Sequence, residues 1–476
     1  MIALHEKIDV SRPLVEAFDY VADFRNTEQW DSTVLSAQKL SAGPVGTGTR
    51  FDVICRLPAG SVTLLYTIIR YEPGKVVSLL GKNRFFEVAD EIHFNETADG
   101  THIDYRATFT FMAPLEAIAN RFQQGLEQMG FESLQGLQQA LEDSFPVPES
   151  TPADRCAERL VLPAIRDFTR IGFTKAKKHW LPMSRWMGEQ HVVITGASAG
   201  LGLAAAHSLA ARGAELTLII RNERKALSLK QDIRRASGNS KIHIEIADLS
   251  LLADVEKLVR RLLRLGKPID ALINNAGALF NPREVTVEGL EKSFALLLLC
   301  PYRLTVGLKP LLVGAGAARV INVVSGGMYS QRLNLEQLEA AAAGYSGSVA
   351  YARSKRALMI VTEHWAQAWA SENIVVNAMH PGWAKTPGVK ASLPAFHTIA
   401  RPLLRSPEQG ADTIVWLTTA TEAAKVSGKL FLDRKPRSTH LIRATKDTEA
   451  ERSALIDILE NYPPATAMRA SPAVVQ

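Results

Sequence analysis

The sequence predicts two structural units of different fold class, an α+β unit of residues 1–143 and an α/β unit of residues 189–443. Three observations lead to this prediction. A stretch rich in proline, serine and threonine, residues 144–153, interrupts the chain and is typical of a linker. Short strand-like segments precede it, whereas apolar strands that alternate with long helices follow it. The charge balance also changes there: residues 1–145 hold 12 basic and 20 acidic side chains, and the rest of the chain holds 43 and 29.

Length and composition limit the class of protein. A chain of 476 residues, 46% of them hydrophobic, predicts two or three ordinary globular domains and excludes wholesale disorder. Three cysteines far apart exclude a disulfide scaffold and a CxxC motif, and favour a reducing, cytoplasmic location. The first ten residues lack the apolar core of a signal peptide, and the longest apolar run, Phe294–Tyr302, is too short to cross a membrane.

The first unit is expected to be mostly antiparallel sheet with a closing helix. Pro13–Val21 predicts a short helix with Ser11 as its N-cap, and Pro114–Leu141 predicts one long helix with apolar residues spaced by three and four. Strands are predicted between turn signals at Ala3–Val10, Arg50–Cys55, Val62–Tyr71, Val76–Leu80, Arg84–Phe94 and Thr101–Phe111.

This unit resembles the helix-grip superfamily, which includes START-like lipid-binding domains and polyketide cyclases (SRPBCC). The resemblance covers residues 1–143. It rests on the order of four short motifs: Asp23-Phe24-Arg25-Asn26 with Trp30-Asp31, Gly43-Pro44-Val45-Gly46-Thr47-Gly48-Thr49, Tyr71-Glu72-Pro73 and Asp99-Gly100-Thr101. The resemblance implies a cavity for a hydrophobic ligand and assigns no catalytic residues.

Residues 144–188 are predicted to be the linker followed by a basic amphipathic arm. Within 155–187, lysines and arginines alternate with large apolar side chains, including Phe168, Trp180 and Trp186. Such a segment can lie on an anionic membrane surface, which would make the protein membrane-peripheral. The favoured interpretation is an arm that packs on the domain that follows, with its basic groups in solvent.

From residue 189 the pattern predicts a doubly wound parallel sheet covered by helices on both faces. Residues 444–476 are expected to form a C-terminal helix and a frayed tail. The strands are predicted at His191–Thr195, Leu216–Ile220, Ile242–Ala247, Ala271–Asn274, Val320–Val324, Val375–His380 and Lys429–Leu432.

A glycine-rich turn follows the first of these strands and opens a helix. Its sequence is Thr195-Gly196-Ala197-Ser198-Ala199-Gly200-Leu201-Gly202. Glycines allow a tight turn and let a phosphate approach N–H groups at the helix N-terminus. The second strand ends at Arg221 with no acidic residue nearby. Because an arginine at this point accommodates a 2′-phosphate, NADP(H) is favoured over NAD(H).

Tyr351 and Lys355 are spaced to share one helix face. A nearby ammonium group is expected to lower the pKa of the Tyr351 phenol toward neutrality, so that this residue can exchange a proton with an alcohol or carbonyl oxygen. Tyr345 is a rival for this role, but the residue four positions later is Val349.

With Asn274-Asn275-Ala276-Gly277 and the strand-end Ser325, these motifs resemble the short-chain dehydrogenase/reductase (SDR) family, whose fold is of the Rossmann type. Further segments resemble its orphan dehydrogenase/reductase member twelve subgroup, and the basic arm resembles that subgroup's N-terminal segment. The segments that carry the resemblance, which covers residues 188–443, are Asp248–Ser250, Val323–Tyr329, Thr362–Gln367, His380–Trp383, Thr386–Gly388, Asp433–Lys435 and Ser438–Leu441.

The resemblance implies a role for each matching residue. Ser325 would hold the substrate oxygen, Tyr351 would be the acid/base, and Lys355 would bind the nicotinamide ribose and tune Tyr351. The remaining cofactor contacts would come from Gly196, Ser198, Gly200 and Gly202 at the pyrophosphate, Asp248 at the adenine, Asn275, Ala276 and Gly277 at the ribose, and Pro381, Gly382 and Thr386 at the nicotinamide.

One position departs from the family. Where the family usually has an asparagine that helps to link the lysine to solvent through a water, this chain has Leu297. Leucine has no polar atom to hold that water. A broken relay would slow turnover without abolishing cofactor binding, and whether Asn322 substitutes is left open.

The sequence therefore predicts an NADP(H)-dependent oxidoreductase that interconverts an alcohol and a carbonyl on a lipophilic small molecule. The alternative is a ligand carrier or sensor with a weakly active reductase domain. His380 is interpreted as a packed structural histidine, and no metal site or nucleic-acid partner is expected. A homo-oligomer is an open alternative, because many members of the family assemble through helices of the parallel sheet.

Overall fold

The computed structural model describes residues 2–31, 33–57, 60–112, 123–142, 149–150, 166–177, 190–385, 400–441 and 445–465, with Trp180, Met187 and Thr398. It divides into two compact units, residues 1–146 and most of residues 147–476. Most of the predicted linker and most of the predicted arm lie outside the described residues.

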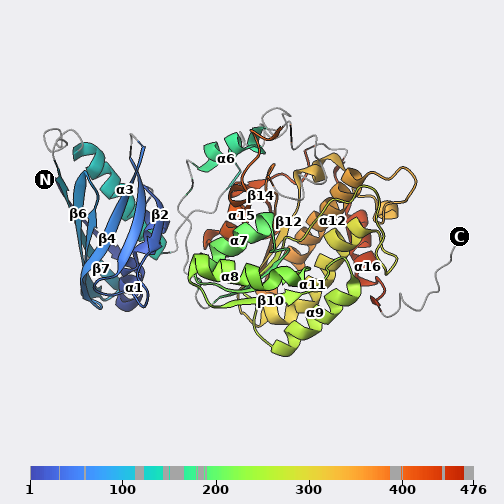
Figure 1. Ribbon diagram of the computed structural model, residues 1–476, viewed down its shortest axis with the longest axis horizontal. Coiled ribbons are helices and arrows are strands. Elements are labelled where there is room, and N and C mark those ends of the chain that lie inside the picture. The colour runs from blue at the N-terminus through green and yellow to red at the C-terminus, as the bar shows by residue number, and fades with distance from the viewer. Residues whose placement is uncertain are drawn as a thin grey trace. The chain divides into compact units, whose positions relative to one another are not determined.

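The first unit is a seven-stranded antiparallel sheet in the order β1-β7-β6-β5-β4-β3-β2 (Figure 1). Alternate side chains of β6 are buried, as expected for a sheet with one face on a core. The core includes Phe18, Phe51, Leu79, Ile92 and Ile103. The strands are β1 (Ile2–Val10), β2 (Val34–Lys39), β3 (Arg50–Leu57), β4 (Gly60–Glu72), β5 (Val76–Lys82), β6 (Phe86–Thr97) and β7 (Gly100–Phe111).

Helix α3 (Gln123–Leu141) is the described part of the predicted long helix. Its Leu134, Leu137 and Leu141 are buried in the core of the sheet, as their spacing predicts. Residues 114–122 of the prediction lie outside the described residues. An antiparallel sheet packed on a long helix agrees with the predicted helix-grip class.

One local prediction for this unit was wrong, and three short elements were not predicted. Helix α1 (Leu14–Ala22) has Pro13 as its N-cap residue with no side-chain cap, so Ser11 does not cap it. Proline at this position fixes the entry to the helix through its own φ angle. Strand β2, the helix α2 (Thr27–Trp30) and a short 3-10 turn, Phe24–Asn26, were not predicted. Strand β2 lies at the sheet edge with a bulge after Val34, which weakens its alternating pattern.

The second unit contains an eight-stranded sheet in the order β10-β9-β8-β11-β12-β13-β14-β15. The first seven strands are parallel, and the last, short strand pairs antiparallel to β14. The strand order reverses between β8 and β11, and ligands bind at such a switch point in doubly wound folds. The strands are β8 (His191–Thr195), β9 (Glu215–Ile220), β10 (Ile242–Ile246), β11 (Ala271–Asn274), β12 (Ala318–Val323), β13 (Ile374–Met379), β14 (Leu430–Leu432) and β15 (Lys435–Arg437).

Helices cover both faces of this sheet (Figure 1). On one side α7 packs against α8 and α15, and on the other α9 packs against α11. Helix α16 begins with a capping box formed by Thr448 and Glu451, which confirms a C-terminal helix. The helices are α6 (Arg170–Lys177), α7 (Gly200–Ala211), α8 (Ala226–Ser237), α9 (Leu252–Leu265), α10 (Lys292–Phe294), α11 (Cys300–Val313), α12 (Gly347–Ala368), α15 (Pro407–Thr419) and α16 (Glu449–Glu460).

A continuous helical segment, Lys292–Val313, contains a π-helical turn at Ala295–Leu299 between α10 and α11. By length and composition this segment could cross a membrane. More than half of its apolar window is buried, and Leu298, Leu304 and Leu308 belong to the core of the unit. The segment is therefore accounted for as a core helix. Insertions of one residue that create π turns occur frequently at functional sites.

Candidate active site

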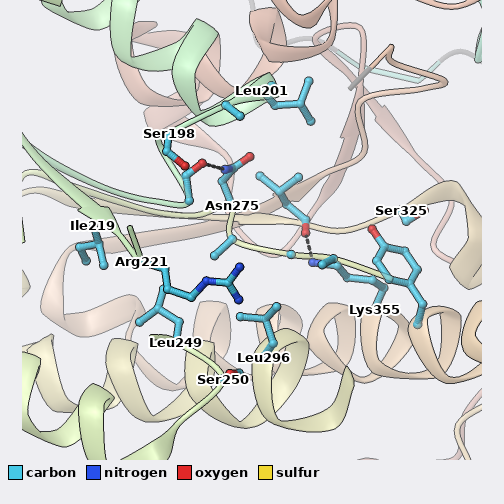
Figure 2. A pocket seen from close by; sticks show the side chains of 18 of the residues that line it. Ser198, Leu201, Ile219, Arg221, Leu249, Ser250, Asn275, Leu296, Ser325 and Lys355 are labelled. Carbon is cyan, nitrogen blue, oxygen red and sulfur yellow. Dashed lines mark hydrogen bonds between the residues drawn. The ribbon is translucent and has the colours of Figure 1, made fainter. Parts of the chain in front are cut away.

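A cleft of about 460 Å³ opens at the carboxyl ends of the parallel strands. Figure 2 shows Arg221 toward one end of it and Lys355 and Ser325 toward the other. The structure thus brings together most of the predicted site residues, which follow the ends of six strands or, for Tyr351 and Lys355, lie on α12. Those that line the cleft are Gly196, Ser198, Gly200, Arg221, Asp248, Asn275, Ala276, Gly277, Ser325, Tyr351, Lys355, Pro381 and Gly382.

Two predicted residues are not among those that line the cleft. Gly202 lies behind the glycine-rich turn, where a Cβ atom would come within 2.5 Å of Asn275 Nδ2 and of the Gly196 carbonyl oxygen. Glycine at 202 therefore permits close packing of α7 on the turn. Thr386 lies outside the described residues.

The glycine-rich turn has the geometry of an anion-binding loop. Gly196 and Gly200 have φ angles of +66° and +58°, a region that other residues adopt only with strain. A Cβ atom on Gly196 would lie 2.8 Å from the backbone Cα of Ala276. The N-cap residue of α7 is Ala199, which has no side-chain acceptor, so the first N–H groups of the helix face the cleft uncapped.

Thr195 fixes the turn to the Asn-Asn-Ala-Gly segment. Its Oγ1 accepts hydrogen bonds of 2.9 Å from the backbone N–H groups of Asn275 and Ala276. The Asn275 side chain in turn donates to the Thr195 carbonyl oxygen at 2.9 Å. The sequence analysis includes Thr195 in the glycine-rich turn but predicts no role for this residue. Its position immediately before the glycine turn was the available signal.

The end of the cleft at Arg221 is polar and open. The Arg221 side chain is 69% exposed, and its Nη1 lies 4.0 Å from Asp248 Oδ2. Asp248 Oδ1 accepts hydrogen bonds from the backbone N–H and the hydroxyl of Ser250, at 2.9 and 2.7 Å. An exposed arginine with one distant acidic neighbour can turn toward a phosphate at small cost.

Ser325, Tyr351 and Lys355 meet at the other end. Ser325 lies two residues after the end of β12 and is the N-cap residue of a 3-10 turn, Gly326–Ser330, whose Gly327 N–H donates to the Ser325 hydroxyl. Tyr351 and Lys355 lie one turn apart on α12. The buried Lys355 ammonium donates to the Val323 carbonyl oxygen at 2.7 Å, as drawn in Figure 2.

The predicted lowering of the Tyr351 pKa was wrong for this structure. Burial raises the pKa of the Tyr351 phenol, and only a hydrogen bond with Ser325 opposes it. Lys355 does not supply the expected field, because burial lowers the pKa of this lysine to about 7 and its ammonium points to Val323. The Lys355 nitrogen is 5.9 Å from the centre of the Tyr351 ring.

Comparison with known proteins agrees with this architecture. The family described as "short chain dehydrogenase" matches residues 190–395, and the family described as "Polyketide cyclase / dehydrase and lipid transport" matches residues 1–142. Dehydrogenase/reductase SDR family member 12 from Bos taurus is 41% identical over 300 residues, covering 62% of this chain and 94% of that protein. The chain belongs to the short-chain dehydrogenase/reductase family.

The SDR unit has more distant relatives and structural neighbours. Polyprenol dehydrogenase from Homo sapiens is 30% identical over 260 residues, covering 52% of this chain and 78% of that protein. The crystal structure of L-sorbose reductase from Gluconobacter frateurii, complexed with NADPH and L-sorbose, is 23% identical with a TM-score of 0.44. It covers 53% of this chain and 98% of that one.

Leu297 of this SDR domain lies in the π-helical turn, fully buried. A Cβ atom on Gly277 would lie 3.1 Å from Leu297 Cδ2 and 3.8 Å from Lys355 Nζ, so the leucine side chain lies close to the lysine. Asn322 does not face Lys355. It accepts a hydrogen bond from Asn274 at 2.8 Å and donates one to Thr362 at 2.9 Å. Asn322 is therefore a core residue of the SDR sheet and does not replace the missing asparagine.

Two nearby polar residues of the SDR domain have structural partners. Tyr345, the rival of Tyr351, is held by Glu291 at 3.0 Å and by Ser293 at 3.2 Å. His380 is buried, accepts a 3.3 Å hydrogen bond from the Gly382 N–H, and has its pKa lowered to about 3 by burial. A histidine of this kind stays neutral, which agrees with a packed structural role.

The SDR cleft has lining residues that sequence reasoning missed. Lys292 and Leu296 lie one helical turn apart, and Lys292 pairs with Glu284 at 2.7 Å. Phe280 lies below the Lys292 ammonium, 4.9 Å from its ring centre. The i, i+4 spacing of Lys292 and Leu296 was a signal for a shared face. Among the described residues, no group of three or more His, Cys, Asp or Glu side chains is placed to bind a metal ion.

Proposed function

We propose that this SDR enzyme uses NADP(H) to interconvert an alcohol and a carbonyl on a lipophilic small molecule. The observation that carries the proposal is the convergence of Ser325, Tyr351 and Lys355 at one end of a cleft whose other end holds Arg221. The site residues remain proposals, as do the domain boundaries at 143, 188 and 443.

The residues present fit a dinucleotide. Gly196 leaves room that a Cβ atom would fill, and the uncapped N-terminus of α7 suits a pyrophosphate. Arg221 would meet a 2′-phosphate, Asp248 the adenine, and Lys355 the nicotinamide ribose. Asn275, Ala276 and Gly277 would line the ribose, and Pro381 and Gly382 would border the nicotinamide. When bound, the nicotinamide supplies or accepts a hydride.

Protein groups would handle the proton. The Ser325 hydroxyl would hold the substrate oxygen, and the Tyr351 phenol would donate its proton to a carbonyl oxygen. Because burial raises the Tyr351 pKa, the phenol is protonated at neutral pH, which suits carbonyl reduction better than alcohol oxidation.

The first experiment measures cofactor binding by fluorescence. NADPH is expected to bind about tenfold more tightly than NADH, because a charge-assisted contact with the 2′-phosphate favours it. Arg221→Ala should remove this preference, whereas Arg224→Ala, in the exposed 3-10 turn that follows, should keep it. Equal affinity for the two cofactors in the unsubstituted protein would contradict the NADP(H) assignment.

The second experiment follows NADPH oxidation with apolar aldehydes, ketones and quinones. Tyr351→Phe should lower the rate by about 10²–10⁴-fold and leave NADPH affinity unchanged, since only the proton donor is lost. A variant that keeps full activity would exclude Tyr351 as the acid.

A lipophilic substrate is favoured by the match of residues 1–142 to a family that includes lipid transport and by the similarity to polyprenol dehydrogenase. The N-terminal unit would capture the ligand and raise its effective concentration at the SDR domain. Mass spectrometry of apolar molecules that co-purify with the chain tests this part. Recovery of none would count against a ligand-capturing unit.

The second candidate is a ligand carrier or sensor whose SDR domain binds cofactor but turns over slowly. The position of Leu297 beside Lys355 favours it, because a leucine cannot hold a water for a proton relay. Leu297→Asn should raise the rate if the relay is broken. An unchanged rate would show that protons reach Tyr351 by another route.

Contact with a membrane is a weaker proposal. Helix α6 carries Lys175 and Lys177 and exposes Ile171, a combination that suits binding to an anionic membrane surface. A cytoplasmic protein with such a helix would be membrane-peripheral. Anionic vesicles should then pull the protein down in a salt-sensitive manner. Failure to associate at low salt would overturn this proposal.

A further inference from the structure

Phe168 precedes the region that matches the short chain dehydrogenase family, yet it packs against the loops that carry the proposed site. The Trp383 N–H donates a 2.7 Å hydrogen bond to the Phe168 carbonyl oxygen. The Phe168 ring meets the His380 ring edge-on at 4.7 Å between centres, and the Trp383 ring at 6.2 Å. The part of the arm around Phe168 is therefore fixed at the carboxyl end of β13.

The Phe168 ring also reaches the loop that follows β12. A Cβ atom on Gly326 would lie 3.0 Å from Phe168 Cε2, and Gly326 directly follows Ser325. A Cβ atom on Gly382, which lines the cleft, would lie 2.6 Å from the Phe168 carbonyl oxygen. Phe168 thus contacts both loops that flank the reacting end of the cleft. Phe168 is not among the residues that line the 460 Å³ cleft, and the residue is half-buried.

The backbone at Phe168 is anchored independently of its ring. The buried Arg405 guanidinium donates to the carbonyl oxygens of Phe168 at 3.1 Å and of Thr169 at 3.2 Å. The same guanidinium forms a buried pair with Asp433, at 2.6 and 2.8 Å. Because these contacts use main-chain oxygens, a substitution of the Phe168 side chain leaves them intact.

We propose that Phe168 is a specificity-determining residue whose ring forms an apolar wall for the carbon skeleton of the substrate, beyond the oxygen held at Ser325. The arm before the SDR domain would then be part of the active site. Gly326 has no side chain, and the Phe168 ring packs where that side chain would lie, so a skeleton that extends from Ser325 past Gly326 would meet the Phe168 ring. The neighbouring His380 and Trp383 rings carry no charge, so this wall suits an uncharged ring or branched hydrocarbon.

This inference rests on the proposed function and is tested on the full chain with NADPH bound. We would compare Phe168→Ala, Phe168→Leu and Phe168→Trp with Ile171→Ala, a control in α6 whose side chain is 48% exposed. Steady-state constants are measured for a series from acetaldehyde to cyclic and branched ketones. Phe168→Ala should raise KM for the bulky ketones by about tenfold, the usual effect of a lost apolar contact, with kcat, acetaldehyde KM and NADPH affinity changed little.

Phe168→Leu should behave as an intermediate, and Phe168→Trp should reject the largest ketones. Equal KM changes for small and bulky substrates, or constants like those of Ile171→Ala, would overturn the inference while leaving the proposed function intact. Should the unsubstituted protein bind the ketones without turnover, the same comparison is made on their dissociation constants from tryptophan quenching. In that case the proposed function fails, and a Phe168-dependent loss of affinity still supports the inference. Binding of no ketone would contradict both.

Discussion

The two units of the chain bury ionisable groups in opposite ways. In the SDR unit, Arg405 and Asp433 are both almost fully buried and form a two-point ion pair. In the N-terminal unit, Asp90 is buried with tyrosine hydroxyls around it, of which Tyr105 donates to Oδ1 at 3.2 Å. Among the described residues, Asp90 Oδ2 has no hydrogen-bond partner.

This contrast has a physical consequence. A buried pair keeps its geometry as long as both charges remain, and removing one partner leaves the other unpaired at high cost. A buried acid without a counter-charge avoids ionisation instead, and burial raises the pKa of Asp90 to about 7. In the SDR unit, therefore, a buried ion pair holds the segment around Phe168 in place, whereas the N-terminal unit contains a buried acid whose pKa is near neutrality.

The largest effect is expected for Arg405→Ala. The variant leaves Asp433 buried without its partner and frees the carbonyl oxygens of residues 167–169, so the SDR unit should lose roughly 3–5 kcal/mol of unfolding free energy. Arg332→Ala is the matched control, because its pair with Glu451 at 2.6 Å is exposed and contributes about 0–1 kcal/mol. Chemical denaturation measures both. Equal losses in the two variants would remove the distinction between buried and exposed pairs.

A smaller effect of opposite sign is expected for Asp90→Asn. The folded unit prefers the protonated acid, so ionisation lowers stability progressively from about pH 4 to pH 7, and the loss persists above pH 7. Asparagine removes this ionisation and keeps an acceptor for Tyr105. At pH 8 the variant should be more stable by up to about 4 kcal/mol, and at pH 4 the two proteins should be equal.

Asp104→Asn is the control within the same sheet. Although burial opposes it, hydrogen bonds from His5 and Arg106 lower the pKa of Asp104 to about 2. Its stabilising contribution is present above about pH 4 and is lost as pH falls toward 2, so Asp104→Asn should lose stability at pH 8. Hydrogen exchange of β6 and β7 in the full chain measures both variants. A gain that is the same at pH 4 and pH 8 would show that Asp90 does not titrate in this way.

The sequence could predict the features that depend on local spacing. The glycine turn, the Tyr351–Lys355 pair and the positions of the strands along the chain follow from patterns within single elements, and the structure brings nearly all the named residues to one cleft. The position of Thr386 stays a prediction. The fold class of both units was predicted for the same reason, since alternation and helical spacing are local patterns.

Features that depend on distant contacts could not be predicted. Phe168 and Arg405 are 237 positions apart in the sequence, and no pattern in either segment indicates the other. The pKa directions of Tyr351 and Lys355 were missed because they are set by burial in the folded unit, which spacing along one helix does not report. Ser11 was predicted as a cap from residue type alone, whereas Pro13 sets the start of α1.

The smallest effect concerns Lys355. This residue is an exception to the contrast between the units, because it belongs to the SDR unit and is buried, yet its hydrogen bond goes to a main-chain carbonyl oxygen and not to an acidic side chain. Burial lowers its pKa to about 7, so at pH 8 it is mostly neutral in the free protein. An anionic dinucleotide favours the ammonium form, and binding should take up a fraction of a proton at pH 8 but almost none at pH 6. Calorimetry in buffers of different ionisation enthalpy measures this uptake.

Lys355→Met should abolish the proton uptake, whereas Lys292→Met, at a cleft lysine already paired with Glu284, should retain it. A binding enthalpy independent of buffer at pH 8 would show that Lys355 is already charged before the cofactor arrives.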